Sequence, residues 1–381
     1  MNSCVMSRVR PATLEDLSAL VALERACFSR DRISRRSFRH FIQRAHAVFL
    51  VAVEENHTLS GYGVLLLRRG AQLARIYSLA VAPEMRGGGR AKLLLKALEE
   101  AALEHRTAWV RLELHQDNEA AIALYQNRGY RPFERFIDKD EGFAEAVRME
   151  KSLLRNLEPG DTPWPYYAQS LPFTCGPASL MMAMGGFFPE LALDRSLELQ
   201  LWRESTTIFM TSGHGGCGPH GLAVAALHRG YEVRIHTSVG KDLFVDSVRH
   251  PDKKSVIRLV ESNFIDVLHQ HDVNVQEEPM TLEEISAALE AGWAVLVLIS
   301  AYRLSGSKAP HWVIVAAINH GFVYVHEPDL DDEKGQTSTE CIGIPIPCEA
   351  FVGMMSYGKA RQQAAVLLRP PRMESITVDE N

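Results

Sequence analysis

The stretch LAVAPEMRGGGRAKLLLKALEEAALEH, residues 79–105, decides the fold of the first half of the chain. It has the pattern of a strand end, a glycine-rich turn and a long amphipathic helix. Such a turn points several backbone amides outward at a helix N-terminus, where they can bind a pyrophosphate. Glycine is also a plain connector, so the turn by itself is weak evidence for a phosphate site.

The residues around this stretch alternate between strand and helix patterns. Strands are expected at 5–10, 48–55, 61–68 and 74–83, and helices from Thr13 and over the basic stretch 30–44. That basic stretch is either a phosphate-binding patch or an amphipathic helix, and its apolar spacing favours the helix. The spacing is that of Ile33, Phe38, Phe41 and Ile42. The first half is therefore expected to be an α/β fold, a mixed sheet with flanking helices.

Composition places the chain among soluble globular proteins. Its 381 residues are 46% hydrophobic and 23% charged, and this length suits two domains. Apolar runs such as AVLVLIS, 294–300, are far shorter than the roughly 20 residues of a membrane span. The first residues, MNSCVMSRVRPA, lack the apolar core of a secretory signal, and six scattered cysteines do not form a disulfide framework. We expect a cytoplasmic protein without a membrane partner.

The two halves differ in charge. Residues 1–154 contain 24 Lys and Arg against 19 Asp and Glu, a net charge of +5. The remaining residues contain 17 against 28, a net charge of −11. An acidic second half argues against nucleic acid as its partner and favours a basic peptide.

A specific spacing identifies the glycine-rich turn. Arg86, Gly89 and Ala91 match the Arg/Gln-x-x-Gly-x-Gly/Ala pattern of the GNAT N-acetyltransferases. Downstream, LELHQDNEAAIALYQNRGYRP, 112–132, resembles the second signature of that family. Residues 5–152 therefore resemble a GNAT domain of the RimI type, which acetylates N-terminal amines of proteins.

This resemblance implies acetyl-CoA as the cofactor and assigns roles to single residues. Asn118 would help to seat the cofactor, Glu113 would be the general base, and Tyr125 would be the acid that protonates the leaving thiolate. Alternatively, Glu113 only fixes a neighbouring strand or helix cap, and Tyr125 is only a core aromatic residue. Backbone amides would hold the pantetheine and the pyrophosphate at Leu79, Val81, Arg86, Gly87, Gly88, Gly89, Arg90 and Ala91.

The segment KSLLRNLEPGDTPWPYY, with three prolines and a glycine, predicts a domain boundary after the last strand of the first half. We expect an acetyltransferase domain at 1–154, a linker at 155–165, a second domain at 166–370 and a tail at 371–381. The second domain is expected to be α+β, with a helical start and middle. Its β-rich end would contain WAVLVLIS, HWVIVAAI and GFVYVHEPD.

The second domain begins with QSLPFTCGPASLM, 169–181, where Cys175 precedes a run of helix formers. Amides and the macrodipole at a helix N-terminus stabilise a thiolate, the nucleophilic form of cysteine. His311 begins a strand, and Gln169 lies six residues before Cys175, a spacing that lets its amide reach an oxyanion beside the sulfur. The alternative for Cys175 is a buried structural thiol.

These stretches resemble the double-glycine leader peptidases, papain-like enzymes that trim bacteriocin-type precursors. QSLPFTCGPASL is similar to their Gln-x5-Cys signature, and HWVIVAAINHGFVYVHEPD to their histidine strand. The resemblance implies a papain-like cysteine peptidase fold over about 163–368. The family has Asp-Pro where this chain has Glu327-Pro328, so either Glu327 or Asp329 would orient His311.

Four further histidines and one cysteine are weaker candidates. His214, Cys217 and His220 have a spacing that suggests a metal site, but a plain glycine-rich loop is favoured, so no metal is expected. His320 is expected in a turn, and His326 is expected on the opposite strand face from Glu327.

The sequence thus predicts a bifunctional enzyme that acts on a peptide or protein with a free amine. An N-acetyltransferase would be fused to a cysteine peptidase. Two alternatives stay open for the second half: a peptide-binding module, or an acyltransferase that forms an amide because an amine intercepts the acyl-enzyme.

Overall fold

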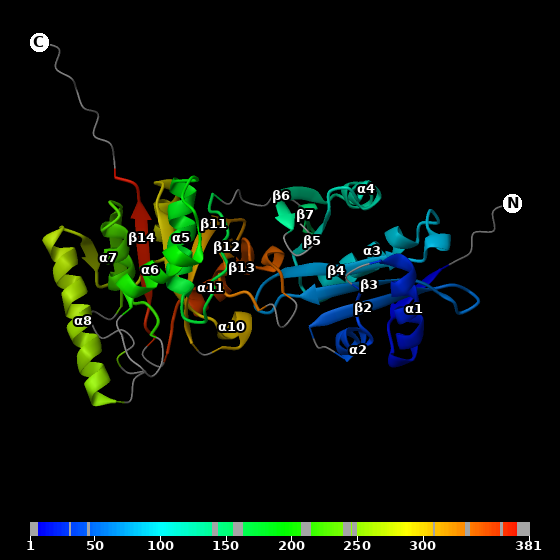
Figure 1. Ribbon diagram of the computed structural model, residues 1–381, viewed down its shortest axis with the longest axis horizontal. Coiled ribbons are helices and arrows are strands. Elements are labelled where there is room, and N and C mark those ends of the chain that lie inside the picture. The colour runs from blue at the N-terminus through cyan, green and yellow to red at the C-terminus, as the bar shows by residue number, and fades with distance from the viewer. Residues whose placement is uncertain are drawn as a thin grey trace, which may run out of the picture. The chain divides into compact units, whose positions relative to one another are not determined.

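A computed structural model describes residues 7–29, 32–43, 46–138, 144–154, 163–206, 215–238, 245, 250–307, 309–331, 336–358 and 361–371. The chain divides into two compact units between Pro159 and Gly160 (Figure 1). Residues 155–162 of the expected linker and 372–381 of the expected tail lie outside the described residues.

The first unit is built on a mixed seven-stranded sheet with the order β1-β2-β3-β4-β5-β7-β6. Only β4 and β5 pair in parallel, and the other neighbours are antiparallel. The strands are β1 (Arg8–Pro11), β2 (Ala47–Val53), β3 (Leu59–Leu67), β4 (Leu73–Val81), β5 (Trp109–His115), β6 (Arg131–Asp138) and β7 (Ala144–Ser152).

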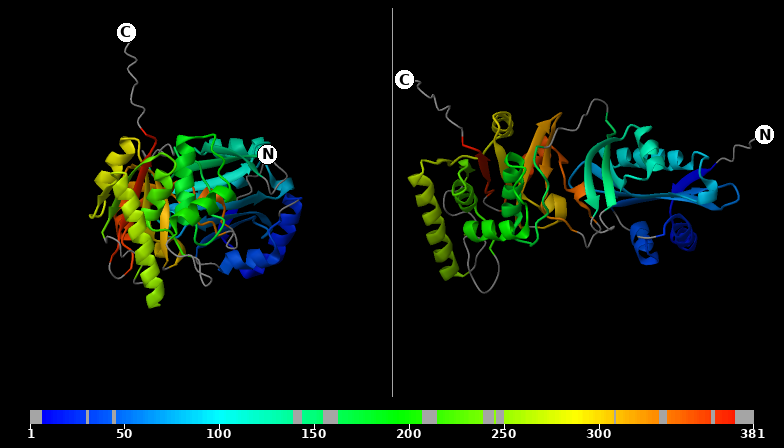
Figure 2. Two further views of the ribbon diagram at one scale, coloured as in Figure 1. Left: turned by 60° about the vertical axis from the view of Figure 1, so that its left-hand side comes forward. Right: turned by 45° about the horizontal axis from the view of Figure 1, so that its top comes forward.

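Helices cover both faces of this sheet (Figures 1 and 2). One face packs against α1 (Leu17–Cys27) and α2 (Arg35–Gln43), and the other against α3 (Arg90–Glu104) and α4 (Glu119–Gln126). Phe38 and Phe41 of α2 are buried, so the amphipathic interpretation of the basic stretch is confirmed. The α/β fold predicted for the first half, a mixed sheet with flanking helices, is also confirmed.

The start of α1 shows how local sequence sets an element. Thr13 precedes a short 3-10 turn, Leu14–Asp16, and its amide donates to the Asp16 Oδ2 at 2.8 Å. Thr13 and Asp16 thus form a capping box, the arrangement typical of a Thr three residues before an Asp, at the helix start that the sequence predicts from Thr13.

The parallel pair β4 and β5 separates partway along. Leu73–Arg75 pair with Trp109–Arg111, and the later residues of the two described strands are not paired with each other. Amides on the β5 side of the end of β4 are therefore released from the sheet ladder.

The second unit has its own seven-stranded sheet, with the order β13-β12-β11-β10-β14-β8-β9. Only β8 and β9 pair in parallel. The strands are β8 (Glu232–Thr237), β9 (Asn274–Gln276), β10 (Ala294–Ser300), β11 (Pro310–Asn319), β12 (Phe322–His326), β13 (Ile344–Pro347) and β14 (Ala364–Arg369).

Helices pack on this second sheet in two tiers (Figure 1). Helix α5 contacts β10 and β11, and α7 contacts β8 and β14. Helix α6 packs against both α5 and α7, and α8 packs against α7. The helices are α5 (Cys175–Phe187), α6 (Arg195–Ser205), α7 (Pro219–Leu227), α8 (Pro251–Gln270), α9 (Leu282–Glu290), α10 (Tyr302–Ser305) and α11 (Cys348–Met354). A cysteine-bearing helix on a largely antiparallel sheet is the α+β arrangement that the sequence predicts, and it is compatible with a peptidase-like fold.

Close packing at Gly176 holds the start of α5 against the sheet. A Cβ at this position would lie 3.1 Å from the Leu222 side chain and 3.2 Å from that of Trp312. Ser179, one turn further, donates to the backbone oxygen of Trp312 at 3.3 Å. The glycine therefore lets the residue before it, Cys175, approach β11 closely.

Within the described residues, no helix combines the length and apolar character that crossing a membrane requires.

Candidate active sites

The glycine-rich turn of the first unit adopts a conformation that needs glycine. Gly87 and Gly89 both have φ of 81°, a left-handed backbone that other residues rarely adopt, and Gly89 is the N-cap of α3. Open space lies where their side chains would be. The first amides of a helix have no partner within the helix, so this turn is suited to an anion such as a diphosphate.

The two arginines of the turn are bound to the protein itself. Arg90 donates from Nε and Nη2 to the two oxygens of Glu54, at 2.7 and 2.9 Å, and this hydrogen bonding lowers the pKa of Glu54 to about 2. Arg86 donates from Nε to the Val81 oxygen at 3.2 Å. Glu54 is not predictable from the local sequence, because it lies 36 residues from its partner Arg90. Both arginines thus brace the turn, which leaves its amides as the main anion donors.

The end of β4 supplies amides that point away from β3. The Ala82 amide bonds to the Ser60 oxygen on the β3 side, at 2.9 Å. Amides alternate in direction along a strand, so those of Leu79 and Val81 point to the β5 side, where pairing has stopped. This geometry supports the predicted pantetheine contacts.

Glu113 on β5 is bound by two arginines of neighbouring strands. Its Oε1 accepts from Arg75 Nη1 of β4 at 3.0 Å, and its Oε2 lies 3.8 Å from Arg148 Nε of β7. These contacts tie three strands together and favour the alternative in which Glu113 fixes its neighbours. Its role as a base stays a prediction.

Tyr125 on α4 is buried in the core between the sheet and α3, with its ring 5.3 Å from that of Tyr130. Burial raises the pKa of Tyr125 above its ordinary value, so the hydroxyl keeps its proton at neutral pH. A protonated phenol in this position suits a general acid, and the packing also fits a core aromatic residue. Asn118 caps α4, where its side chain accepts from the Ala121 amide at 3.2 Å, and its contact with a cofactor stays a prediction.

In the second unit, Cys175 is the first residue of α5 and is buried. His311, at the start of β11, is hydrogen bonded both to Cys175 and to Glu327. Its Nε2 meets the Glu327 Oε1, which leaves Nδ1 for the sulfur. Three residues that the sequence selected from distant stretches are therefore in contact.

The charge of His311 follows from these contacts. Burial alone would disfavour the imidazolium, but attraction to Glu327 and Cys175, together with hydrogen bonds to both, raises the pKa of His311 well above its ordinary value. A charged imidazole next to a thiol at a helix N-terminus favours the thiolate.

The sequence allowed either Glu327 or Asp329 to orient His311, and the structure gives these two carboxylates different partners. Glu327 binds His311, whereas Asp329 accepts from the Gln169 Nε2 at 3.3 Å and donates its own amide to the Glu327 Oε1 at 2.9 Å. Tyr166, which the sequence analysis missed, donates its hydroxyl to the Glu327 backbone oxygen at 3.0 Å. Gln169 thus lies next to Asp329, on the Glu327 side of the site.

The weaker candidates have structural places. His326 is buried between the Trp164 oxygen and the Gly343 amide, at 2.9 and 2.8 Å. His320 has φ of 47° in the turn between β11 and β12. Both positions agree with their low ranking.

Only two of the three residues whose spacing suggested a metal site lie within the described part of the chain. His214 lies outside the described residues. His220 is buried with its Nδ1 2.5 Å from Glu261, and the Cys217 backbone oxygen accepts from the Trp312 indole at 2.9 Å. No group of three or more metal-ligating side chains occurs in the part of the chain that the structure describes.

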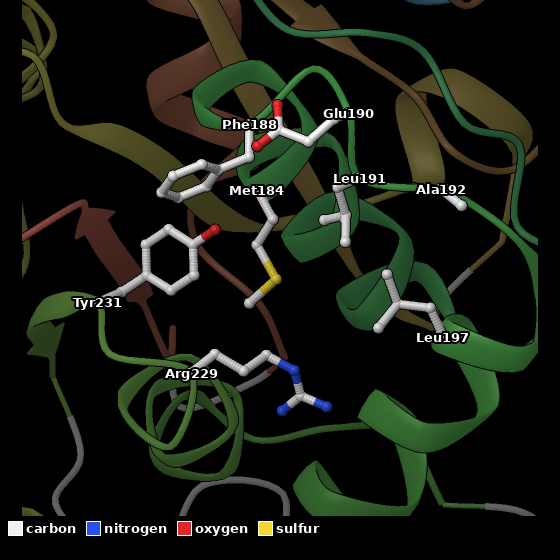
Figure 3. Close-up of a pocket in the computed structure, with 8 residues that line it drawn as sticks. All are labelled: Met184, Phe188, Glu190, Leu191, Ala192, Leu197, Arg229 and Tyr231. Carbon is white, nitrogen blue, oxygen red and sulfur yellow. The ribbon is translucent and has the colours of Figure 1, made fainter.

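A pocket of about 520 Å³ opens beside the far end of α5 (Figure 3). The rings of Phe188 and Tyr231 lie side by side on one flank, and Leu191 and Leu197 lie on the other (Figure 3). The helix places the pocket's lining residues Met184 and Phe188 roughly 14 and 20 Å from Cys175, at about 1.5 Å per residue. It is therefore separate from the thiol site.

Comparison with known proteins classifies both units. Residues 164–369, more than half of the chain, match the model of the Peptidase_C39 like family. The chain belongs to this family. Residues 17–130 match the acetyltransferase (GNAT) family, so the first unit of this Peptidase_C39 like protein is a GNAT acetyltransferase domain.

Individual relatives align with the first unit. A putative [ribosomal protein bS18]-alanine N-acetyltransferase of Bacillus subtilis is 27% identical over 125 residues, which are 32% of this chain and 80% of the relative. The crystal structure of the Escherichia coli ribosomal-protein-S18-alanine N-acetyltransferase has 21% identity and a TM-score of 0.35, and covers 40% of this chain and 99% of its own. The PaiA N-acetyltransferase of Thermoplasma acidophilum in complex with coenzyme A has 22% identity and a TM-score of 0.34, with 39% and 99% covered.

Replacing Gly89 by Glu tests the anion site. The substitution introduces a carboxylate and strains the left-handed backbone, so we expect the affinity for acetyl-CoA to fall at least about tenfold in calorimetry on the full chain. Gly70→Glu is the matched control, because Gly70 has φ of 71° in the turn at the opposite end of β4. Equal affinities of wild type and Gly89→Glu would contradict the assignment.

Replacing Tyr125 by Phe keeps the ring packing and removes only the hydroxyl. If Tyr125 is the acid, kcat for acetyl transfer falls about 10²-fold or more while KM for acetyl-CoA stays nearly constant. Tyr130→Phe is the control, since it removes the hydroxyl of the neighbouring buried ring and keeps the packing of that ring against Tyr125. A rise in KM alone would make Tyr125 a binding residue.

The state of Cys175 is tested by its alkylation rate with iodoacetamide. At pH 6, where ordinary thiols are protonated, Cys175 should react faster than the other cysteines, and His311→Ala should slow it at least about tenfold. The raised pKa of His311 fixes the sign of the pH effect. The stabilisation that charged His311 provides is fully present below the ordinary imidazole pKa of about 6.5. It is lost as the pH rises through the raised pKa of His311.

Peptide mapping after limited labelling gives the ranking. The comparison set is Cys4, Cys27, Cys217, Cys341 and Cys348. Burial raises the pKa of Cys27, Cys217 and Cys348, which opposes their reaction. A Cys175 no faster than these thiols would rule out an activated nucleophile.

Proposed function

We propose that this chain is a bifunctional peptide-processing enzyme, an acetyl-CoA-dependent N-acetyltransferase joined to a cysteine peptidase. The observation that carries the proposal is the position of His311, which contacts Cys175 and the buried Glu327 at the same time. A structural thiol has no need of a histidine that is itself oriented by a carboxylate. The arrangement therefore favours catalysis over a peptide-binding module.

In the proposed peptidase reaction, the Cys175 thiolate attacks a peptide carbonyl and the Gln169 amide donates to the oxyanion. The His311 imidazolium gives its proton to the leaving amine, and a thioester to Cys175 remains. Neutral His311 then takes a proton from water, and the hydroxide releases the acid. Glu327 holds the ring orientation throughout.

In the first unit, acetyl-CoA when bound supplies the acetyl thioester. The amides of residues 86–91 would hold its diphosphate, and those of Leu79 and Val81 its pantetheine arm. Tyr125 would donate its proton to the departing sulfur. The acceptor would be the N-terminal amine of a peptide or protein, as the names of the aligned ribosomal-protein-alanine acetyltransferases suggest.

The two reactions form a sequence, because peptide cleavage creates the kind of amine that the acetyltransferase accepts. The resemblance to double-glycine leader peptidases suggests cleavage after Gly-Gly. A new N-terminal alanine would then suit the first unit. The net charge of −11 over residues 155–381 favours a basic peptide.

A synthetic basic peptide with an internal Gly-Gly-Ala sequence tests the proposal. After incubation of the full chain with this peptide and acetyl-CoA, mass spectrometry should show a truncated fragment that carries an acetyl group on its alanine. Cys175→Ala should abolish truncation but still acetylate a peptide made with alanine at its N-terminus. Gly89→Glu should still truncate the first peptide but should acetylate neither the new fragment nor the peptide made with alanine at its N-terminus.

Other outcomes distinguish the alternatives for the second unit. An amide-linked product in the presence of a second amine, in place of the free acid, would indicate acyl transfer. Binding of the peptide without any covalent product at Cys175 would indicate a binding module and contradict the peptidase assignment.

A further inference from the structure

A fully buried carboxylate lies behind the segment that leads into Cys175. Glu198 is in the first turn of α6 and has no exposed surface. It accepts hydrogen bonds from three residues of that segment, Tyr167, Ser170 and Thr174. One side chain of α6 therefore fixes three points along residues 167–174.

Both carboxylate oxygens of Glu198 are fully used. Oε2 accepts from the Tyr167 hydroxyl at 3.0 Å and the Ser170 hydroxyl at 2.5 Å. Oε1 accepts from the Ser170 amide at 2.8 Å and the Thr174 hydroxyl at 2.5 Å. Burial, and then the charge of Glu198, raises the pKa of Tyr167, so its hydroxyl remains a donor at neutral pH. A carboxylate has about four acceptor positions, and four donors fill them.

The three fixed points surround Gln169, whose own side chain is weakly held. Its Nε2 makes the 3.3 Å bond to Asp329, and its Oε1 is buried with no hydrogen-bond partner among the residues that the structure describes. Its backbone amide is firmer, with a 2.8 Å bond to the Pro328 oxygen. The position of the Gln169 side-chain amide is therefore determined by the backbone of residues 167–174 more than by the contacts of the side chain itself.

We propose that Glu198 is a positioning residue for the thiol reaction. Its carboxylate fixes residues 167–174 so that the Gln169 amide stays beside the carbon that Cys175 attacks. Glu198 acts through Gln169 and not on the substrate. The inference rests on the proposed peptidase function of the second unit.

A conservative substitution separates the position of Glu198 from its charge. In Glu198→Gln the amide oxygen can replace Oε1 and the amide nitrogen Oε2, since the hydroxyls of Tyr167 and Ser170 can accept as well as donate. We expect kcat for cleavage of the Gly-Gly-Ala peptide to stay within about threefold of wild type. Glu198→Ala removes the clamp, and kcat should fall about ten- to a hundredfold, below the 10²- to 10³-fold cost of losing an oxyanion donor outright.

The rate of Cys175 alkylation distinguishes a positioning role of Glu198 from a merely structural one. Iodoacetamide reacts with the Cys175 thiolate without forming an oxyanion, so its rate in Glu198→Ala should stay within about twofold of wild type. General damage to the fold would slow alkylation and cleavage together. Equal losses in both would overturn the proposal.

A double-mutant cycle tests whether Glu198 acts through Gln169. Once Gln169→Ala has removed the oxyanion donor, adding Glu198→Ala should lower kcat by less than about twofold. Independent, multiplying effects would contradict the proposal. The matched control is Glu204→Ala on the same helix, which breaks a 2.5 Å bond to Arg229 and should leave cleavage unchanged.

If Glu198→Ala does not fold, Ser170→Ala removes one exposed hydroxyl donor and keeps the Ser170 amide bond. We expect a smaller fall in kcat with normal alkylation, and a wild-type kcat would overturn the proposal. Wild-type chain that fails to cleave the peptide would refute the proposed function and this inference together. Cleavage by wild type and Glu198→Ala at equal rates would refute this inference alone.

Discussion

The second unit depends on the contact between His311 and Glu327, two ionisable groups that are both buried. Ionisable groups removed from water are costly unless they are paired, so the fold must bring the start of β11 and the end of β12 together. The Glu327 carboxylate also accepts a hydrogen bond from the Asp329 amide, and the backbone oxygen of Glu327 accepts one from the Tyr166 hydroxyl. The pair therefore aligns His311 with the segment that precedes Cys175.

In the first unit the equivalent constraint is the early end of pairing between β4 and β5. A continuous ladder would use the amides of Leu79 and Val81 within the sheet. Their release, next to the left-handed Gly87 and Gly89, gives a line of backbone donors from the strand into the start of α3. Arg90 supports this line by its bond to Glu54, so its charge serves the fold.

The two proposed chemistries meet at the peptide bond and its product. Thiol attack on an amide releases an amine, and acetyl transfer consumes an amine. The placement of Gln169, the proposed oxyanion donor, depends on a contact network. Glu198 holds the segment around Gln169 on one side, and Pro328 and Asp329 hold Gln169 on the other. Such networks connect residues that have no local relation in the sequence.

The sequence alone determined the features that arise from local spacing. The glycine turn, the capping box at Thr13 and the placement of Cys175 at a helix start each depend on neighbouring residues. The apolar stretches WAVLVLIS, HWVIVAAI and GFVYVHEPD indicated β10, β11 and β12. Tertiary structure decided that Glu327 contacts His311, that Glu113 is bound by arginines of two other strands, and that Glu198 lies behind Gln169. Strand alternation predicts the same side for Glu327 and Asp329, but both follow the end of β12, and only the folded structure gives them different partners, His311 and Gln169.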